Sequence, residues 1–110
     1  MWAKPTKQDL AKMPKLGETD KEGNATTIVQ GHFFLEGNDW FVTEYDPVEE
    51  LFYGFAILNS DYQMAEWGCI SYQELKDLKM RGMFEVDYDK YWTKTEVQNV
   101  EKIKLGNGVY

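Results

Sequence analysis

Cysteine and histidine are almost absent from this chain, in which Cys69 and His32 are the sole examples. A lone cysteine forms no internal disulfide, so a reducing, cytoplasmic setting is the default expectation. One residue of each type is also too few for a zinc site. No apolar run approaches the roughly 20 residues of a membrane-spanning helix. The charged N-terminal stretch, MWAKPTKQDLAKMPKLGETD, does not have the pattern of a secretory signal.

Lysine and arginine are missing between Glu22 and Leu75, so all 12 of these residues lie in the two flanks. The net charge is −7, and about −10 falls in this middle segment. Because nucleic-acid binding requires Lys or Arg against phosphate, direct binding of DNA or RNA there is not expected. Ten acidic residues make up the segment's charge: Glu22, Glu36, Asp39, Glu44, Asp46, Glu49, Glu50, Asp61, Glu66 and Glu74.

What the chain does contain is typical of a small globular domain. Apolar residues make up 43% of its 110 positions and aromatic residues 15%, which is enough to build a core without disulfides or a metal. We expect a single domain over residues 1–110. Residues 94–110, which include a weak and exposed helix pattern followed by a glycine-containing tail, are expected to be a looser C-terminal extension.

Four strands are predicted in the middle of the chain. The stretch TTIVQGHFFLEGNDWFVTEYDP contains two β-branched and aromatic runs separated by residues 36–39, which indicates a hairpin. The stretch ELFYGFAILN is apolar on both alternating sets, as expected of a central strand covered on both faces. The fourth strand is predicted at AEWGCIS, and MFEVDYD resembles a short strand or an extended edge.

Two helices are predicted from their caps. Thr6 followed by Asp9 indicates a short N-terminal helix that ends before Pro14. Ser71 and Glu74 have the spacing of a capping box, and the helix they begin should run to about Met80, with Gly82 ending it. The predicted fold class is therefore α+β, with a mainly antiparallel sheet of about four strands packed by one or two short helices.

Catalytic signals are weak. His32 would need Ser60, Cys69 or Ser71 beside it to form a nucleophilic pair, and no nucleophile-elbow motif surrounds any serine. A structural role for His32 is favoured, and Cys69 is interpreted as an inert core thiol. No phosphate- or dinucleotide-binding glycine pattern occurs. The sequence predicts no cofactor, and the alternative of a carboxylate-bound magnesium or calcium ion is disfavoured because no calcium-loop pattern occurs.

The acidic and aromatic middle supports two interpretations. One is a solvated sheet face that discourages edge aggregation. The other is a docking surface for a protein with a basic surface, on which aromatic side chains supply contact area and carboxylates supply steering. The candidate partner-binding residues are Asp39, Trp40, Glu44, Asp46, Glu49, Glu50, Asp61, Glu66 and Trp67.

The order of segments resembles the domain-of-unknown-function family 2958. The resemblance is carried by MWAKPTKQDLAKMPKL, HFFLEGNDWFVTEYDP, LFYGFAILNSDYQMAEWGCISYQELKDLK and FEVDYDKYW, and extends to about Thr93. Asn38 departs from a small residue found before Asp39 in the family. The resemblance implies a bacterial or phage origin, on plasmids and other mobile elements, and a cytoplasmic setting. It implies no activity.

The leading functional hypothesis is a non-enzymatic accessory protein of a mobile element that binds another protein, such as a host defence or regulatory protein. The first alternative is a carboxylate- or metal-dependent hydrolase or nuclease subunit, which would require Asp39, Glu44 and Glu66 to converge in a pocket. The second is a DNA mimic, which would require carboxylates spaced like phosphates along one exposed ridge. The partner's identity and the oligomeric state are not indicated by the sequence.

Overall fold

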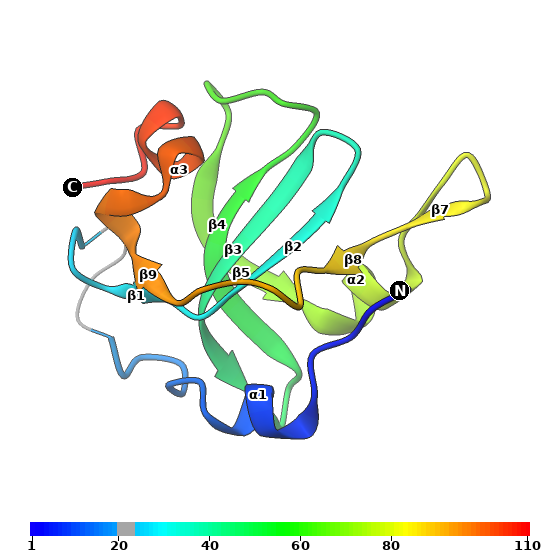
Figure 1. Cartoon of the computed structure of the whole chain (residues 1–110), viewed down its shortest axis with the longest axis horizontal. Helices are drawn as coiled ribbons and strands as arrows, with labels where there is room; N and C mark the ends of the chain where they lie inside the picture. The colour runs from blue at the N-terminus through cyan, green and yellow to red at the C-terminus, as the bar shows by residue number, and fades with distance from the viewer. Residues whose placement is uncertain (20–23) are drawn as a thin grey trace.

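The computed structural model describes residues 1–19 and 24–110 and is an α+β fold around one antiparallel sheet (Figure 1). That sheet has five strands in the order β5-β4-β3-β2-β8. The sequence predicted about four strands. The five strands of the sheet are β2 (Gly31–Leu35), β3 (Asn38–Asp46), β4 (Leu51–Ile57), β5 (Glu66–Ser71) and β8 (Asp87–Tyr88).

The remaining elements are short. They are α1 (Lys7–Ala11), β1 (Ile28–Val29), α2 (Tyr72–Asp77), β6 (Lys79–Met80), β7 (Phe84–Glu85), β9 (Thr95–Glu96), the 3-10 helix η1 (Val97–Asn99) and α3 (Glu101–Leu105). Strand β1 pairs with β9, and β6 pairs with β7, in two small antiparallel ladders. Within the described ranges, no helix is long and apolar enough to cross a membrane.

The predicted hairpin is formed by β2 and β3, but its turn is tighter than expected. Glu36 and Gly37 alone form the turn, with φ of 29° and 84°, in the left-handed region that a two-residue hairpin turn requires. Asn38 and Asp39, which the sequence assigned to the turn, already pair within β3. Asp39 is therefore positioned by a strand and not by a loop.

Strand β4 is central, as its two apolar sides predicted. It pairs with β3 on one side and with β5 on the other. Phe52 lies in a core on one face, and Phe55 and Ile57 lie in a core on the other. The pairing register between β3 and β4 shifts between Val42 and Glu44, as a β-bulge does.

The two faces of the sheet bury separate apolar clusters. The first includes Phe33 and Phe52 together with Tyr72 and Leu75 of α2. The second joins sheet residues to the C-terminal segment, and its members are Val29, Phe41, Phe55, Ile57, Val97, Val100 and Ile103. Each face is therefore closed by a short element from outside the sheet.

The C-terminal segment packs more closely than the sequence predicted. Val97 and Ile103 are completely buried, and a Cβ added at Gly106 or Gly108 would come within 3 Å of the Phe55 ring. The expected exposed helix and loose extension are thus replaced by β9, η1 and α3. The physical reason is that the second face of the sheet needs an apolar cover.

The Ser71 helix is confirmed at its start and corrected at its end. Ser71 Oγ accepts a hydrogen bond from Glu74 N–H at 3.1 Å, which is one of the two bonds of the predicted capping box. The return bond from Ser71 N–H to the Glu74 side chain is not among the bonds of the described residues. The helix ends at Asp77, three residues before the predicted end, because Leu78 is already extended and β6 pairs with β7. Gly82, with φ of 71°, lies in the turn of that hairpin and does not cap a helix.

The predicted N-terminal helix is also confirmed. Thr6 Oγ1 accepts from Asp9 N–H, and the Asp9 carboxylate accepts from Thr6 N–H. The fifth strand, β8, comes from the stretch that resembled an extended edge, and it pairs with β2. Residues near the N-terminus form backbone hydrogen bonds beside β8: Trp2 N–H donates to Val86 C=O, and Tyr88 N–H donates to Ala3 C=O.

Candidate functional site

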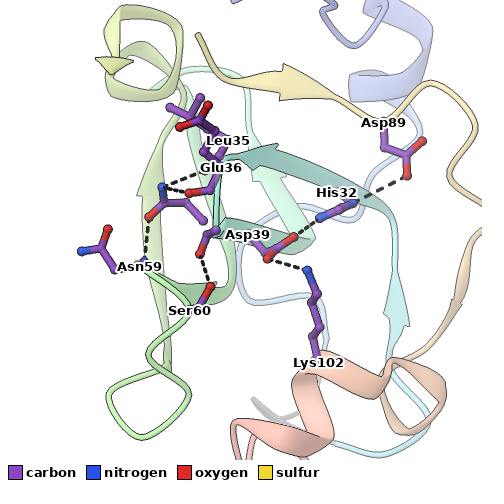
Figure 2. Close-up of polar contacts among 10 residues, drawn as sticks. His32, Leu35, Glu36, Asp39, Asn59, Ser60, Asp89 and Lys102 are labelled. Atoms are coloured by element: carbon purple, nitrogen blue, oxygen red, sulfur yellow. Dashed lines mark hydrogen bonds and ion pairs between the residues drawn. The ribbon is translucent and has the colours of Figure 1, made fainter. Parts of the chain in front are cut away.

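Asp39 is the centre of a polar cluster that joins β2, β3 and α3 (Figure 2). It lies on β3 and is 4% exposed. His32 Nε2, from β2, is 2.7 Å from its Oδ1, and Lys102 Nζ, from α3, is 3.0 Å from its Oδ2. Burial raises the pKa of Asp39, but the hydrogen bonds from His32 and Lys102 outweigh burial and hold that pKa below its ordinary value. Asp39 is therefore a carboxylate fixed between two partners.

His32 is hydrogen-bonded through one ring nitrogen, and the other has no hydrogen-bond partner among the described residues. Nε2 contacts Asp39, while Nδ1 is buried and lies 3.6 Å from Oδ2 of Asp89. The ring also stacks on Phe41 at a centroid distance of 4.5 Å and an interplanar angle of 7°. His32 and Asp39 also line, together with Lys102, a surface pocket of about 360 Å³. The contacts with Asp39 and Phe41 join β2 to β3, and the structural role favoured for His32 stays a prediction.

The three nucleophile candidates named from the sequence have other neighbours in the part of the chain that the structure describes. Cys69 and Ser71 lie on β5, which is separated from β2 by β4 and β3. Ser60 Oγ is directed to Gly37 C=O at 3.5 Å (Figure 2). Cys69 is exposed, and not part of the core as predicted, because β5 is an edge strand.

Glu44 is also buried and holds a loop. Its carboxylate accepts from Gly17 N–H and Thr19 N–H, both at 2.9 Å, and from the Thr19 hydroxyl. These bonds fasten the segment after α1 to β3. Glu44, like Asp39, is thus used inside the fold, although the sequence proposed both residues for a partner surface.

Asp46 at the end of β3 and the two acids of the β3–β4 connection remain at or near the surface. Asp46 accepts from Val48 N–H at 2.9 Å, and Glu50 forms an ion pair with Lys76 at 3.5 Å. Glu49 is exposed. Glu22 lies outside the described residues.

The two candidate tryptophans have different surroundings. Trp40 is buried in the cluster that packs against α2. Trp67 is half-buried on β5, stacks on Tyr53 with an interplanar angle of 13°, and donates from Nε1 to Gly108 C=O at 2.9 Å. Trp40 therefore serves the core, whereas Trp67 fastens the C-terminal segment to the sheet.

A surface cleft lies where β4 ends and β5 begins. It has a volume of about 230 Å³ and combines two exposed apolar side chains with two exposed carboxylates. We call it the β4–β5 cleft, and its lining residues are Ala56, Leu58, Asn59, Asp61, Met64 and Glu66.

The backbone around the β4–β5 cleft is tied to the β2–β3 turn. Asn59 N–H donates to the Asn38 side chain at 2.9 Å (Figure 2). Ser60 N–H donates to Gly37 C=O at 2.7 Å. Asp61 accepts from Gln63 N–H and Met64 N–H. The loop therefore presents Met64 from a bonded turn, and Met64 is 76% exposed.

Sequence reasoning selected Asp61 and Glu66 for a partner surface but missed the apolar half of this cleft. Leu58 follows the alternating pattern of β4 directly, yet it is 51% exposed. The missed signal was an apolar residue on each side of a turn, at Leu58 and Met64, with no strand or helix to bury either one.

The proposed convergence of Asp39, Glu44 and Glu66 is not found. Asp39 bonds to His32 and Lys102, Glu44 bonds to the Gly17–Thr19 loop, and Glu66 lines the β4–β5 cleft. Among residues 1–19 and 24–110, no group of three or more His, Cys, Asp or Glu side chains has the arrangement of a metal site.

The family model described as "Protein of unknown function (DUF2958)" matches residues 4–101 of this chain. The chain therefore belongs to the DUF2958 family. The match extends past Thr93, where the resemblance was placed from the sequence, to the start of α3. Comparison with curated proteins and with solved structures gives no match.

Proposed function

We propose that this protein is a non-enzymatic accessory protein that binds the basic surface of another protein through the β4–β5 cleft. The observation that carries this proposal is the pairing of two exposed acids with two exposed apolar side chains in one cleft. Asp61 and Glu66 supply the charge, and Leu58 and Met64 supply the apolar contact. No Lys or Arg within the described residues forms an ion pair with either acid.

Each half of the cleft has a physical role in binding. Removing Leu58 and Met64 from water stabilises a complex by roughly 25 cal/mol per Å² of apolar area buried. Methionine adapts its shape to irregular partners. The two carboxylates attract a basic partner before contact and disfavour an acidic one. The β4–β5 cleft therefore suits a partner that presents Lys or Arg next to an apolar side chain.

Other proposed surface acids are less suited to this role. Asp39 and Glu44 are buried and hydrogen-bonded, and Glu50 is paired with Lys76. We therefore narrow the partner surface to the β4–β5 cleft. The hydrolase alternative required Asp39, Glu44 and Glu66 to converge in a pocket, and these three residues have separate partners. The DNA-mimic alternative requires carboxylates spaced like phosphates along one exposed ridge, to which buried Asp39 and Glu44 do not contribute.

The biological setting is part of the same proposal. The family resemblance supports a cytoplasmic protein from a bacterial plasmid, phage or integrated element. An accessory protein in that setting meets host proteins, and a host defence or regulatory protein with a basic surface is the partner class we propose.

Affinity capture with matched variants tests the proposal. The wild-type protein, Asp61→Asn/Glu66→Gln and Glu49→Gln/Glu74→Gln are immobilised and exposed to host lysate, and retained proteins are quantified by mass spectrometry. The second variant removes the same two charges from exposed positions at the β3–β4 connection and α2.

We expect at least one basic protein to be retained by the wild type and by Glu49→Gln/Glu74→Gln but lost, by about tenfold or more, with Asp61→Asn/Glu66→Gln. A tenfold loss corresponds to about 1.4 kcal/mol of binding free energy. If both variants retain the same proteins as the wild type, the cleft does not bind the partner.

A further inference from the structure

The two edges of the main sheet are protected differently. The β8 edge is only two residues long, and Trp2 and Ala3 form backbone hydrogen bonds beside it. The β5 edge is six residues long, and no described residue forms a backbone hydrogen bond on its outer side. An edge strand of that kind presents unpaired N–H and C=O groups, which are a template for another strand.

The outward-facing groups of β5 follow from its register with β4. The pairs run without a shift from Leu51↔Ser71 to Ala56↔Glu66, and Tyr72 N–H donates to Glu50 C=O at 3.0 Å. Because hydrogen-bonded and non-hydrogen-bonded pairs alternate in an antiparallel ladder, Gly68 and Ile70 direct their backbone groups to β4. Trp67 and Cys69 direct theirs outward.

The side chains of β5 leave this edge accessible. A Cβ built on Gly68 meets no atom within 4 Å, and Cys69 is exposed. Proline, lysine and arginine, which natural edge strands use to block pairing, are absent from residues 66–71, where Glu66 is the one charged residue.

The β5 edge is continuous with the β4–β5 cleft, because Glu66 belongs to both. A chain that paired antiparallel with β5 would therefore have its C-terminal end beside Asp61, Met64 and Glu66. Basic residues at that end would meet the two carboxylates, and an apolar residue before them would meet Leu58 and Met64.

We propose that the partner binds as an extended basic segment that adds a strand antiparallel to β5, with its C-terminal Lys or Arg in the β4–β5 cleft. This inference rests on the proposed function of that cleft. Main-chain hydrogen bonds to Trp67 and Cys69 supply affinity in this binding mode, and the cleft supplies side-chain specificity. A second copy of this chain is disfavoured as the occupant because its β5 offers no Lys or Arg to the two acids.

The test uses a synthetic probe, the peptide acetyl-Ser-Val-Thr-Val-Thr-Leu-Arg-Lys-amide, and a second peptide of the same sequence with alternate backbone nitrogens methylated. Titration is followed by NMR of the ¹⁵N-labelled protein together with amide hydrogen exchange. In the free protein, Trp67 and Cys69 amides should exchange faster than those of Gly68 and Ile70.

Binding of the first peptide should protect Trp67 and Cys69. Methylation should weaken binding by at least about tenfold, since it removes the donors that pair with β5. Asp61→Asn/Glu66→Gln should also weaken binding, whereas Glu49→Gln/Glu74→Gln should not.

Each other outcome is distinct. Equal binding of both peptides, with loss in Asp61→Asn/Glu66→Gln, would support the cleft as a docking site and overturn strand addition. Protection of Trp67 and Cys69 that is independent of Asp61 and Glu66 would support strand addition and count against the proposed role of the cleft. Protection that rises with protein concentration alone would identify a second copy as the occupant, and no binding by either peptide at millimolar concentration would overturn the inference.

Discussion

Lys102 Nζ on α3 lies 3.0 Å from Asp39 Oδ2 on β3 and joins positions 63 residues apart in the sequence. Lys102 is half-exposed, whereas Asp39 is buried. The contact therefore compensates a buried carboxylate and fastens α3 over the second apolar cluster. Without Lys102, the Asp39 carboxylate would keep one side-chain partner among the described residues, the His32 ring.

Lys102→Met should lower the free energy of unfolding by about 1 kcal/mol. The effect is no larger because Lys102 is half-exposed and solvent weakens its ion pair with Asp39. Lys104→Met is the matched control, since Lys104 pairs with exposed Glu101 on the same helix, and it should cost no more than about 0.5 kcal/mol. Urea unfolding measures both. Equal effects of the two substitutions would show that the Asp39 contact has no special weight.

The contact also shows which features a sequence pattern can and cannot reveal. Thr6 with Asp9 and Ser71 with Glu74 lie three residues apart, so their caps were predictable from local spacing. The central position of β4 followed from apolar residues on both alternating sets. These features depend on neighbours along the chain.

The features that the sequence did not predict depend on distant partners. Asp39 and Glu44 looked like surface acids because Lys102 and the Gly17–Thr19 loop are remote in sequence. The stretch that contains β8 was predicted as a short strand or an extended edge, but its pairing with β2 was not, because a strand of two residues carries little register signal. Val97, Val100 and Ile103 are spaced three residues apart, as on one buried face, but the charged residues between them obscure that pattern in the sequence.

Gly54 on β4 should tolerate no side chain. A Cβ there would lie 2.1 Å from the Phe41 carbonyl oxygen, a backbone atom that cannot rotate away. Gly54→Ala should therefore cost about 3 kcal/mol or more, or prevent folding.

Gly68 on β5 is the control for Gly54, because an added Cβ meets nothing within 4 Å. Gly68→Ala should be neutral or stabilise the protein by about a few tenths of a kcal/mol, because alanine has less backbone freedom than glycine in the unfolded chain and causes no strain here. Thermal unfolding of both variants distinguishes the two positions. Comparable losses at Gly54 and Gly68 would contradict the close approach of β3 to β4.

Tyr88 should make the protein sensitive to alkali. Burial and the nearby carboxylates of Asp9 and Asp89 raise the pKa of Tyr88 to about 12, above its ordinary 10.0. A raised pKa means that the folded state holds the proton more tightly, so the stabilisation is complete below pH 10 and is lost as the pH rises toward 12.

We expect the free energy of unfolding to fall by about 2 kcal/mol between pH 10 and pH 12 through Tyr88, with further loss from Tyr45 and Tyr72, whose pKa values burial also raises. Tyr88→Phe should reduce that slope without abolishing it. Denaturant unfolding at several alkaline pH values measures the effect, and an unchanged slope in Tyr88→Phe would show that the ionisation of Tyr88 is not coupled to folding.

Ser71→Ala should lower stability by about 1 kcal/mol, since it removes the oxygen that accepts from Glu74 N–H at the start of α2. Ser60→Ala is a suitable comparison, because Ser60 Oγ makes only a 3.5 Å contact with Gly37 C=O. Chemical denaturation midpoints check the difference. A midpoint for Ser71→Ala equal to that of the wild type would rule out a stabilising cap.

The binding of a basic partner at the β4–β5 cleft is tested most directly by the salt dependence of association, measured in stopped-flow with the purified captured partner. At low ionic strength the wild type and Glu49→Gln/Glu74→Gln should associate at similar rates, and both rates should fall as salt screens the carboxylates over a Debye length of about 10 Å at 0.1 M. Asp61→Asn/Glu66→Gln should associate more slowly at low salt and show a flatter salt dependence. Association of the wild type that is constant from low to high salt, or that is unchanged in Asp61→Asn/Glu66→Gln, would contradict a role for these two carboxylates in binding.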